Sequence, residues 1–89
     1  MSMLSEDKVK KIKEQILVEL YHQGLKPIFT SELASLIIRD EEFTKRLLQA
    51  LMKDNLVVEV NKSAKGNTYS KWKRWKLSDS AYKAMQQVY

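Results

Sequence analysis

Residues 31–60 read "SELASLIIRDEEFTKRLLQALMKDNLVVEV", and this stretch holds two helical patterns followed by a change of period. In its first part apolar residues recur three and four positions apart, which predicts a helix over 31–38. Two polar residues then make a tight connection, and the second of them, Asp40, is well suited to cap a helix over 41–54. The stretch therefore predicts two helices joined by a very short turn.

The 41–54 helix is predicted to bury one face and leave the other free. Its inward stripe, with Leu48 at the margin, consists of Phe43, Leu47, Ala50 and Leu51. At 100° per residue this orientation turns outward Glu42, Lys45, Arg46, Gln49, Met52 and Lys53. Arg or Lys can donate to guanine and Gln can pair with adenine, so the outward face suits base edges; an ordinary solvated helix face is the alternative.

The apolar period changes after this helix. Leu56–Val60 is short and β-branched, which predicts a strand. A polar turn containing glycine follows, and "YSKWKRWKL", residues 69–77, alternates between two faces. Trp75 and Leu77 share one parity and are predicted to be buried. Together these features predict a hairpin over 56–77.

The flanking segments predict two further helices. Ser5 is suited to cap a helix over 6–23, which Gly24 ends in the left-handed conformation. The segment "LKPIFT" between this helix and the next suits an edge strand or an extended connector. Ser78 is expected to cap a last helix over 79–89. All 89 residues therefore form one domain of the α+β class, mostly helical.

The net charge of +5 is concentrated in the last third of the chain. Residues 1–60 carry nine Lys or Arg against ten Asp or Glu, a net charge of −1. Residues 61–89 carry seven against one, a net charge of +6. Such asymmetry is typical of a surface that binds a polyanion, although a solvated basic strand is the plainer alternative.

Composition narrows the class of protein. The chain has no cysteine, which excludes disulfides and thiolate metal sites, and its longest apolar runs are three residues, too short to span a membrane. With no secretory signal at the N-terminus, we expect a cytoplasmic protein that does not bind membranes. His22 is the only histidine, and no phosphate loop or nucleophile motif is present. We therefore expect no catalytic residue, no metal site and no cofactor.

Three local patterns resemble the winged helix-turn-helix family: "TSELASLI", "DEEFTKRLLQALMKDNLVVEV" and "WKLSDSAYKAM". The resemblance covers essentially the whole chain. It implies a three-helix core, a short strand, a two-stranded β-wing and a C-terminal helix. The pattern of the winged helices that bind left-handed DNA does not carry over, because Gln49 stands where those proteins have Tyr and the wing has no proline.

The resemblance implies sequence-specific binding of double-stranded DNA, with the 41–54 helix in the major groove and the wing on the backbone. On that recognition helix the implied contacts are Thr44, Lys45, Arg46, Gln49 and Lys53, of which Thr44 is expected to touch a phosphate. At the start of the preceding helix they are Thr30 and Ser31, either of which is also a candidate N-cap. In the wing they are Lys62, Lys65, Asn67, Lys71, Lys73 and Arg74.

The terminal segments carry more apolar surface than a monomer needs. A homodimer is therefore predicted, with an interface formed by Leu4, Val9, Tyr82, Met85 and Tyr89. The expected function is that of a small transcriptional regulator. Two alternatives stay open: a winged-helix module that binds an acidic protein partner, and a nonspecific architectural DNA-binding protein.

Overall fold

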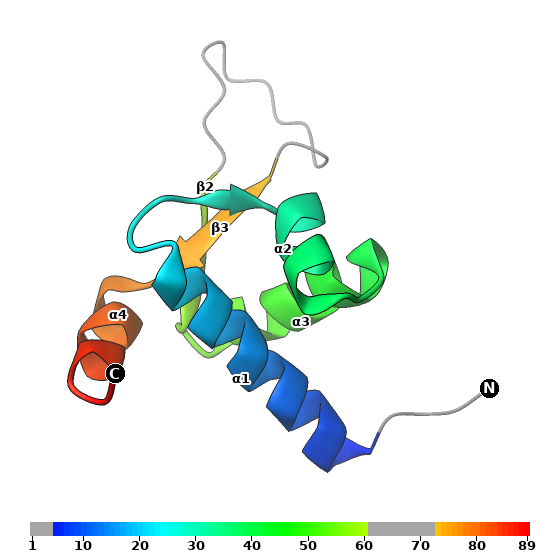
Figure 1. The fold of residues 1–89 in the computed structure, drawn as a ribbon, viewed down its shortest axis with the longest axis horizontal. Helices are drawn as coiled ribbons and strands as arrows, with labels where there is room; N and C mark the ends of the chain where they lie inside the picture. The colour runs from blue at the N-terminus through cyan, green and yellow to red at the C-terminus, as the bar shows by residue number, and fades with distance from the viewer. Residues whose placement is uncertain (1–4, 61–72) are drawn as a thin grey trace, which may run out of the picture.

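The computed structural model describes residues 5–60 and 73–89 and arranges them in four helices and three strands (Figure 1). In chain order these are α1 (Glu6–His22), β1 (Ile28–Phe29), α2 (Thr30–Ile37), α3 (Glu41–Lys53), β2 (Val57–Val60), β3 (Arg74–Leu77) and α4 (Asp79–Gln86). The first three helices pack together beside a small sheet, and α4 lies near the C-terminal end of α1. The mostly helical α+β class is confirmed.

Helix α1 begins at Glu6 as predicted and ends at His22, one residue before the predicted end at residue 23. The Ser5 hydroxyl accepts a hydrogen bond from the backbone N–H of Lys8 at 3.3 Å, which satisfies one of the free donors of the first turn. Gly24 follows the last turn with φ of +68°, a conformation that glycine adopts without steric conflict. Between these ends, Ile12, Ile16 and Leu20 are buried.

Helix α2 begins one residue earlier than the predicted range of 31–38. Its N-cap is Phe29, whose backbone N–H donates to the Glu32 carboxylate at 3.0 Å. Thr30 is already helical, so the prediction that Thr30 or Ser31 caps this helix is wrong. The Glu32 carboxylate, in the first turn, binds the N–H of Phe29 and so fixes Phe29 as the N-cap, while the Thr30 hydroxyl is engaged by the indole of Trp75.

The turn between α2 and α3 contains an unusual backbone conformation. Ile38 has φ of 56° and ψ of 53°, the left-handed region, so α2 ends at Ile37 and not at the predicted residue 38. The N–H of Ile38 donates to Ser35 O at 3.2 Å and that of Arg39 to Ala34 O at 3.0 Å. This pair of bonds is a Schellman motif, which usually has glycine at the left-handed position.

Helix α3 is capped as predicted at its start and ends at Lys53, one residue before the predicted end, in a second Schellman motif. The Asp40 carboxylate accepts from the N–H of Phe43 at 3.0 Å. Asn55 has φ of 62°, and the N–H of Leu56 donates to Leu51 O at 3.0 Å. Asparagine tolerates this conformation better than branched residues do, so the chain turns sharply from α3 into β2.

The sheet has the strand order β1-β3-β2, and both pairings are antiparallel. Val57 lies opposite Leu77 and Glu59 opposite Trp75, which fixes the hairpin register. On the other side of β3, Ile28 lies opposite Trp75. The segment "LKPIFT" therefore supplies a two-residue edge strand that leads directly into α2.

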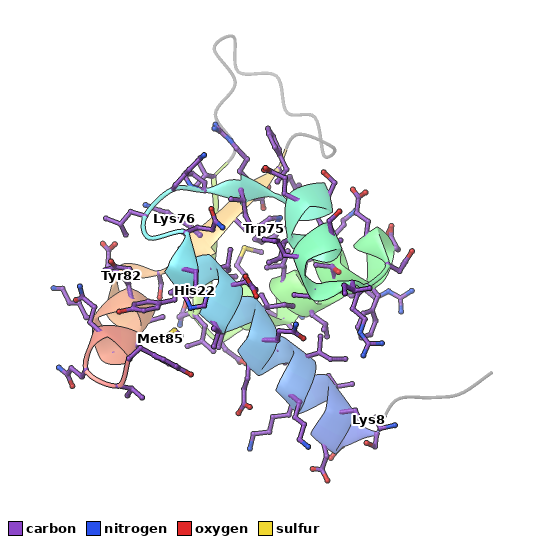
Figure 2. The ribbon with its side chains drawn as sticks, viewed as in Figure 1. Lys8, His22, Trp75, Lys76, Tyr82 and Met85 are labelled. Carbon is purple, nitrogen blue, oxygen red and sulfur yellow. The ribbon has the colours of Figure 1, made fainter. Side chains whose placement is uncertain are left out.

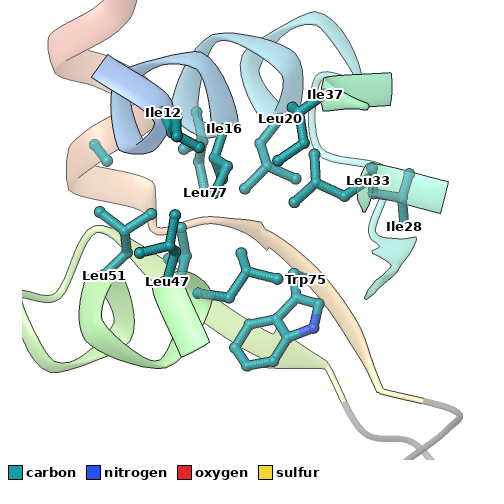
Figure 3. Packing of buried hydrophobic residues seen from close by; sticks show 13 residues of the cluster. Ile12, Ile16, Leu20, Ile28, Leu33, Ile37, Leu47, Leu51, Trp75 and Leu77 are labelled. Atoms are coloured by element: carbon teal, nitrogen blue, oxygen red, sulfur yellow. The ribbon is translucent and has the colours of Figure 1, made fainter. Parts of the chain in front are cut away.

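The core lies between α1, α3 and the sheet (Figure 3). Trp75 and Leu77 are fully buried, which confirms the predicted parity of the hairpin. The buried face of α3, however, differs from the predicted one: it consists of Thr44, Leu47, Leu48 and Leu51. Leu48 was predicted at the margin and is fully buried, whereas Phe43 and Ala50 are only half-buried.

Helix α4 begins as predicted and ends early. The Ser78 hydroxyl accepts from the N–H of Ala81 at 3.1 Å and donates to Asn55 O at 2.8 Å, which ties α4 to the end of α3. The helix ends at Gln86 and not at residue 89. The N–H groups of Val88 and Tyr89 both donate to Met85 O, at 3.0 and 2.9 Å, because the chain leaves the helix through a tight turn.

Candidate nucleic-acid interface

The outward face of α3 is a stripe that runs the length of the helix. Glu42, Arg46 and Lys53 are exposed, and Gln49 is half-buried between them. Their spacing of four, three and four residues places them on one side, opposite the buried Thr44, Leu48 and Leu51. Lys45 lies on the flank and is half-buried. Four of the five predicted contacts on this helix are at least partly accessible to a ligand: Lys45, Arg46, Gln49 and Lys53.

Thr44 is the exception among the predicted contacts on α3. Its side chain is fully buried, and its hydroxyl donates to the backbone carbonyl of Asp40 at 2.8 Å. The prediction that Thr44 contacts a phosphate is therefore wrong. A threonine can lie on the buried face because its hydroxyl is satisfied by the preceding turn of its own helix.

The start of α2 presents one of the two predicted residues. Ser31 is exposed, but Thr30 is buried and accepts a hydrogen bond from the indole N–H of Trp75 at 2.8 Å. Thr30 therefore serves as a structural partner, and the prediction of a direct DNA contact for Thr30 is wrong. No local pattern in the sequence predicts this pair, because its members lie 45 residues apart.

The base of the hairpin carries two of the predicted wing residues. The ammonium of Lys73 lies 3.5 Å from the carboxylate of Glu59, and both side chains are about one-fifth exposed. The guanidinium of Arg74 lies 5.9 Å from the centre of the Phe29 ring, within the range of a cation–π contact. Lys62, Lys65, Asn67 and Lys71 lie outside the described residues.

The Lys73–Glu59 pair is a diagonal neighbour contact across the two strands. Glu59 lies opposite Trp75, and Lys73, the residue just before β3, precedes Trp75 by two positions. A sequence alignment of the two strands in the correct register would have suggested this pair. Since Glu59 offsets the charge of Lys73, Arg74 is the less compensated cation of the two.

The predicted dimer surface is divided between two places. Tyr82 and Met85 pack against the core beside Tyr21, with the rings of Tyr21 and Tyr82 5.3 Å apart. Tyr89 is 65% exposed, and its ring centre lies 5.8 Å from that of Tyr21. Figure 2 shows Lys8, the neighbour of Val9, at the opposite end of α1 from Tyr82 and Met85.

Val9 and Tyr21 are twelve residues apart, about 18 Å along a helix, so Val9 does not share a patch with the tyrosines. Leu4 lies outside the described residues. The structure thus brings together three of the five predicted interface residues: Tyr82, Met85 and Tyr89.

His22 is exposed in the last turn of α1 (Figure 2). Within residues 5–60 and 73–89, no three His, Cys, Asp or Glu side chains are grouped so that they could hold a metal ion. In the same part of the chain, none of the helices has both the length and the apolar composition needed to cross a membrane.

No family model matches the sequence, and no curated protein matches it. Solved structures do share its fold. A MarR family transcriptional regulator from Silicibacter pomeroyi is 18% identical, with a TM-score of 0.69 over 92% of this chain and 51% of that one. A ZitR mutant from Lactococcus lactis is 15% identical, with a TM-score of 0.70 over 92% of this chain and 57% of that one.

A third similar structure is a MepR mutant from S. aureus bound to an oligodeoxyribonucleotide. It is 15% identical, with a TM-score of 0.65 over 93% of this chain and 65% of that one. This chain thus spans from about half to two-thirds of the length of these three proteins. At such identities the likeness shows the fold alone. The chain has the winged helix-turn-helix fold, in which α2 and α3 form the helix-turn-helix and β2 and β3 belong to the wing.

Proposed function

We propose that the chain binds double-stranded DNA in a sequence-specific manner and acts as a small transcriptional regulator without enzymatic activity. The observation that carries the proposal is the stripe on α3: Arg46 and Lys53 are exposed and Gln49 is half-buried between them, while the opposite side of the helix is anchored in the core. A helix held in this way can enter the major groove without unfolding the domain. The similar MepR structure, which is bound to an oligodeoxyribonucleotide, supports the proposal at the level of fold.

The side chains on this stripe match the chemistry of base edges. The guanidinium of Arg46 can donate to O6 and N7 of guanine, and the amide of Gln49 can pair with N6 and N7 of adenine. From Arg46 to Lys53 the helix rises about 10 Å, the length of about three base pairs. Lys45, on the flank, is placed for a phosphate.

The remaining contacts in the proposal go to the DNA backbone. Ser31 is exposed in the first turn of α2, and Arg74 and Lys73 lie at the base of the hairpin. By sequence the segment 61–72 adds Lys62, Lys65, Lys71 and the amide of Asn67. Contacts of this kind position a protein on DNA and make its affinity salt-dependent, but they do not specify bases.

The acidic start of α3 limits how this helix can approach DNA. Glu41 and Glu42 are exposed and follow the cap Asp40. They stabilise the helix N-terminus, yet they would repel nearby phosphates. Glu42 lies on the same stripe as Arg46, where a carboxylate can accept a hydrogen bond from the amino group of cytosine. We therefore expect a cytosine in the preferred site on the side that faces Glu42.

We also propose that the protein binds DNA as a homodimer through the tyrosine surface formed by Tyr21, Tyr82 and Tyr89. In its favour, Tyr89 and Val88 are 65% and 76% exposed at this place. A twofold dimer would present two α3 helices to half-sites about 34–36 Å apart. Sedimentation that shows only monomer at high protein concentration would contradict the dimer without affecting DNA binding.

The test combines selection of preferred duplexes from a random pool with fluorescence anisotropy at several salt concentrations. Arg46→Glu is expected to abolish the sequence preference, whereas Lys10→Glu, the same change of charge on an exposed position of α1, is the matched control and should retain it. Salt-dependent binding without an enriched sequence would indicate an architectural protein. No binding at low salt would refute DNA binding and leave the basic surface to an acidic protein partner.

A further inference from the structure

We propose that the hydrogen bond from Trp75 to Thr30 is a positioning contact for DNA binding. It fixes the cationic base of the hairpin against the first turn of α2, so that the cations of β3 and the outward stripe of α3 approach DNA in one orientation. The inference rests on the proposed function. Neither residue is placed in contact with DNA; both act through their neighbours.

The bond itself is deeply buried. Trp75 is fully buried and Thr30 is 7% exposed, and the indole nitrogen lies 2.8 Å from the threonine hydroxyl oxygen. A buried indole N–H that loses its acceptor loses more than a hydrogen bond, because water cannot replace the partner. Among the described residues, every buried side-chain nitrogen or oxygen has a hydrogen-bond partner, and the partner of the Trp75 indole nitrogen is the Thr30 hydroxyl.

The main chain joins the same two elements. Ile28 pairs with Trp75 and Phe29 with Arg74, and Phe29 is also the N-cap of α2. Strand β1 therefore passes into α2 without a linker. The indole bond crosses the same junction from the core side, so β3 and the first turn of α2 are held both by backbone pairing and by a side-chain contact.

The charged residues depend on this junction for their position. Arg74 precedes Trp75 on β3, and its guanidinium lies over the ring of Phe29 at 5.9 Å. Lys73 is one residue further and lies beside Glu59. On the other side of the junction, Ser31 is exposed in the first turn of α2. If β3 shifts against α2, Arg74 and Lys73 move relative to both Ser31 and the α3 stripe, because α2 packs directly on α3.

The experiment compares Thr30→Val, Trp75→Phe and the double variant with the unchanged protein by anisotropy on its preferred duplex. Each single variant is expected to bind several-fold more weakly. The plot of log affinity against log salt should become shallower by about 1.8, which corresponds to two lost phosphate contacts at about 0.9 each. Because both substitutions remove one bond, the double variant should bind no more weakly than the weaker single variant.

Two further variants separate positioning from other roles. Thr30→Ser keeps the hydroxyl and should retain the wild-type slope. Thr44→Val is the matched control for Thr30→Val, since the Thr44 hydroxyl is also buried and makes a 2.8 Å hydrogen bond to the backbone carbonyl of Asp40. It should lower the melting temperature without changing the slope of log affinity against log salt. Thermal unfolding confirms that each variant is folded at the assay temperature.

The inference is overturned if Thr30→Val and Trp75→Phe bind with the wild-type slope. It is also overturned if Thr30→Val weakens binding while Trp75→Phe does not, since Thr30 would then contact DNA directly. Failure of the unchanged protein to bind DNA at low salt refutes the proposed function and the inference together, so the two failures are distinguishable.

Discussion

Replacement of Ile38 by glycine is expected to stabilise the protein. Ile38 ends α2 with φ of 56°, a region where the branched side chain of an L-residue meets its own backbone. The conformation costs about 1–2 kcal/mol relative to the right-handed one. Ile38 is 87% exposed, so the side chain recovers little of this by burial.

The net gain in stability from Ile38→Gly is smaller than the conformational strain that it relieves. Glycine loses more backbone freedom on folding, which costs about 0.5–1 kcal/mol. We therefore expect Ile38→Gly to raise the free energy of unfolding by about 0.5–1 kcal/mol. For a domain of this size the melting temperature should rise by about 2–8 °C. Urea unfolding followed by circular dichroism measures the free energy of unfolding, and a thermal scan measures the melting temperature.

The second Schellman motif supplies the reciprocal experiment. Asn55 holds the same place after α3, with φ of 62°, and is also exposed. Asn55→Ile should therefore destabilise the protein by about 1 kcal/mol, and Ile38→Val, which keeps the branched side chain, should leave stability unchanged. A melting temperature for Ile38→Gly at or below that of the wild type, together with no effect of Asn55→Ile, would refute the reasoning.

Three further changes test the packing and the caps. Leu48→Ala should lower the free energy of unfolding in urea by about 2–5 kcal/mol, because Leu48 is fully buried. The loss should exceed that of Leu36→Ala, since Leu36 is 45% exposed, and equal losses would contradict the observed buried face of α3. Ser78→Ala should lower the free energy of unfolding by about 1–2 kcal/mol, because it removes both the cap of α4 and the hydrogen bond to Asn55 O. A loss under a few tenths of a kcal/mol would show that neither bond contributes to stability. Lys73→Met should change stability by less than about 1 kcal/mol, as expected of a partly exposed ion pair, and a larger loss in thermal unfolding would reveal a packing role.

Local signals predicted several of the helix caps, but not the N-cap of α2, the end of α2 at Ile38 or the early end of α4. Ser5, Asp40 and Ser78 are capping residues by chemistry, and Gly24 and Asn55 are residues that tolerate positive φ, so their roles could be seen in the sequence. Ile38 could not, because nothing in a branched apolar residue suggests the left-handed region. There the Schellman bonds and the packing of α2 against α3 override the local preference of the residue.

The orientation of α3 was predicted only in part, for a different reason. Apolar periodicity selected Phe43 and Ala50 for the inward stripe, whereas the structure buries Thr44 and Leu48. A pattern that counts only apolar residues cannot place a threonine inside, since the acceptor that satisfies it, Asp40 O, belongs to the backbone. Arg46 and Lys53 face outward under either orientation, so this part of the candidate site could be predicted. The loss of Thr30 from the site could not, because its partner Trp75 is distant in the sequence.

The pairing of β1 with β3 also constrains the order in which the protein folds. It joins residues that lie about as far apart as Thr30 and Trp75, 45 positions, and the whole of α2, α3 and β2 lies inside that loop. Contacts between neighbours in the sequence form first, and the entropy of closing a long loop delays the distant ones. We therefore expect α2 and α3, the two helices of the helix-turn-helix, to dock before the sheet is complete. Burial of Trp75 then marks a late step in folding, and in a Trp72→Phe variant, which keeps Trp75 as its one tryptophan, the fluorescence should follow a slower phase than the appearance of helix.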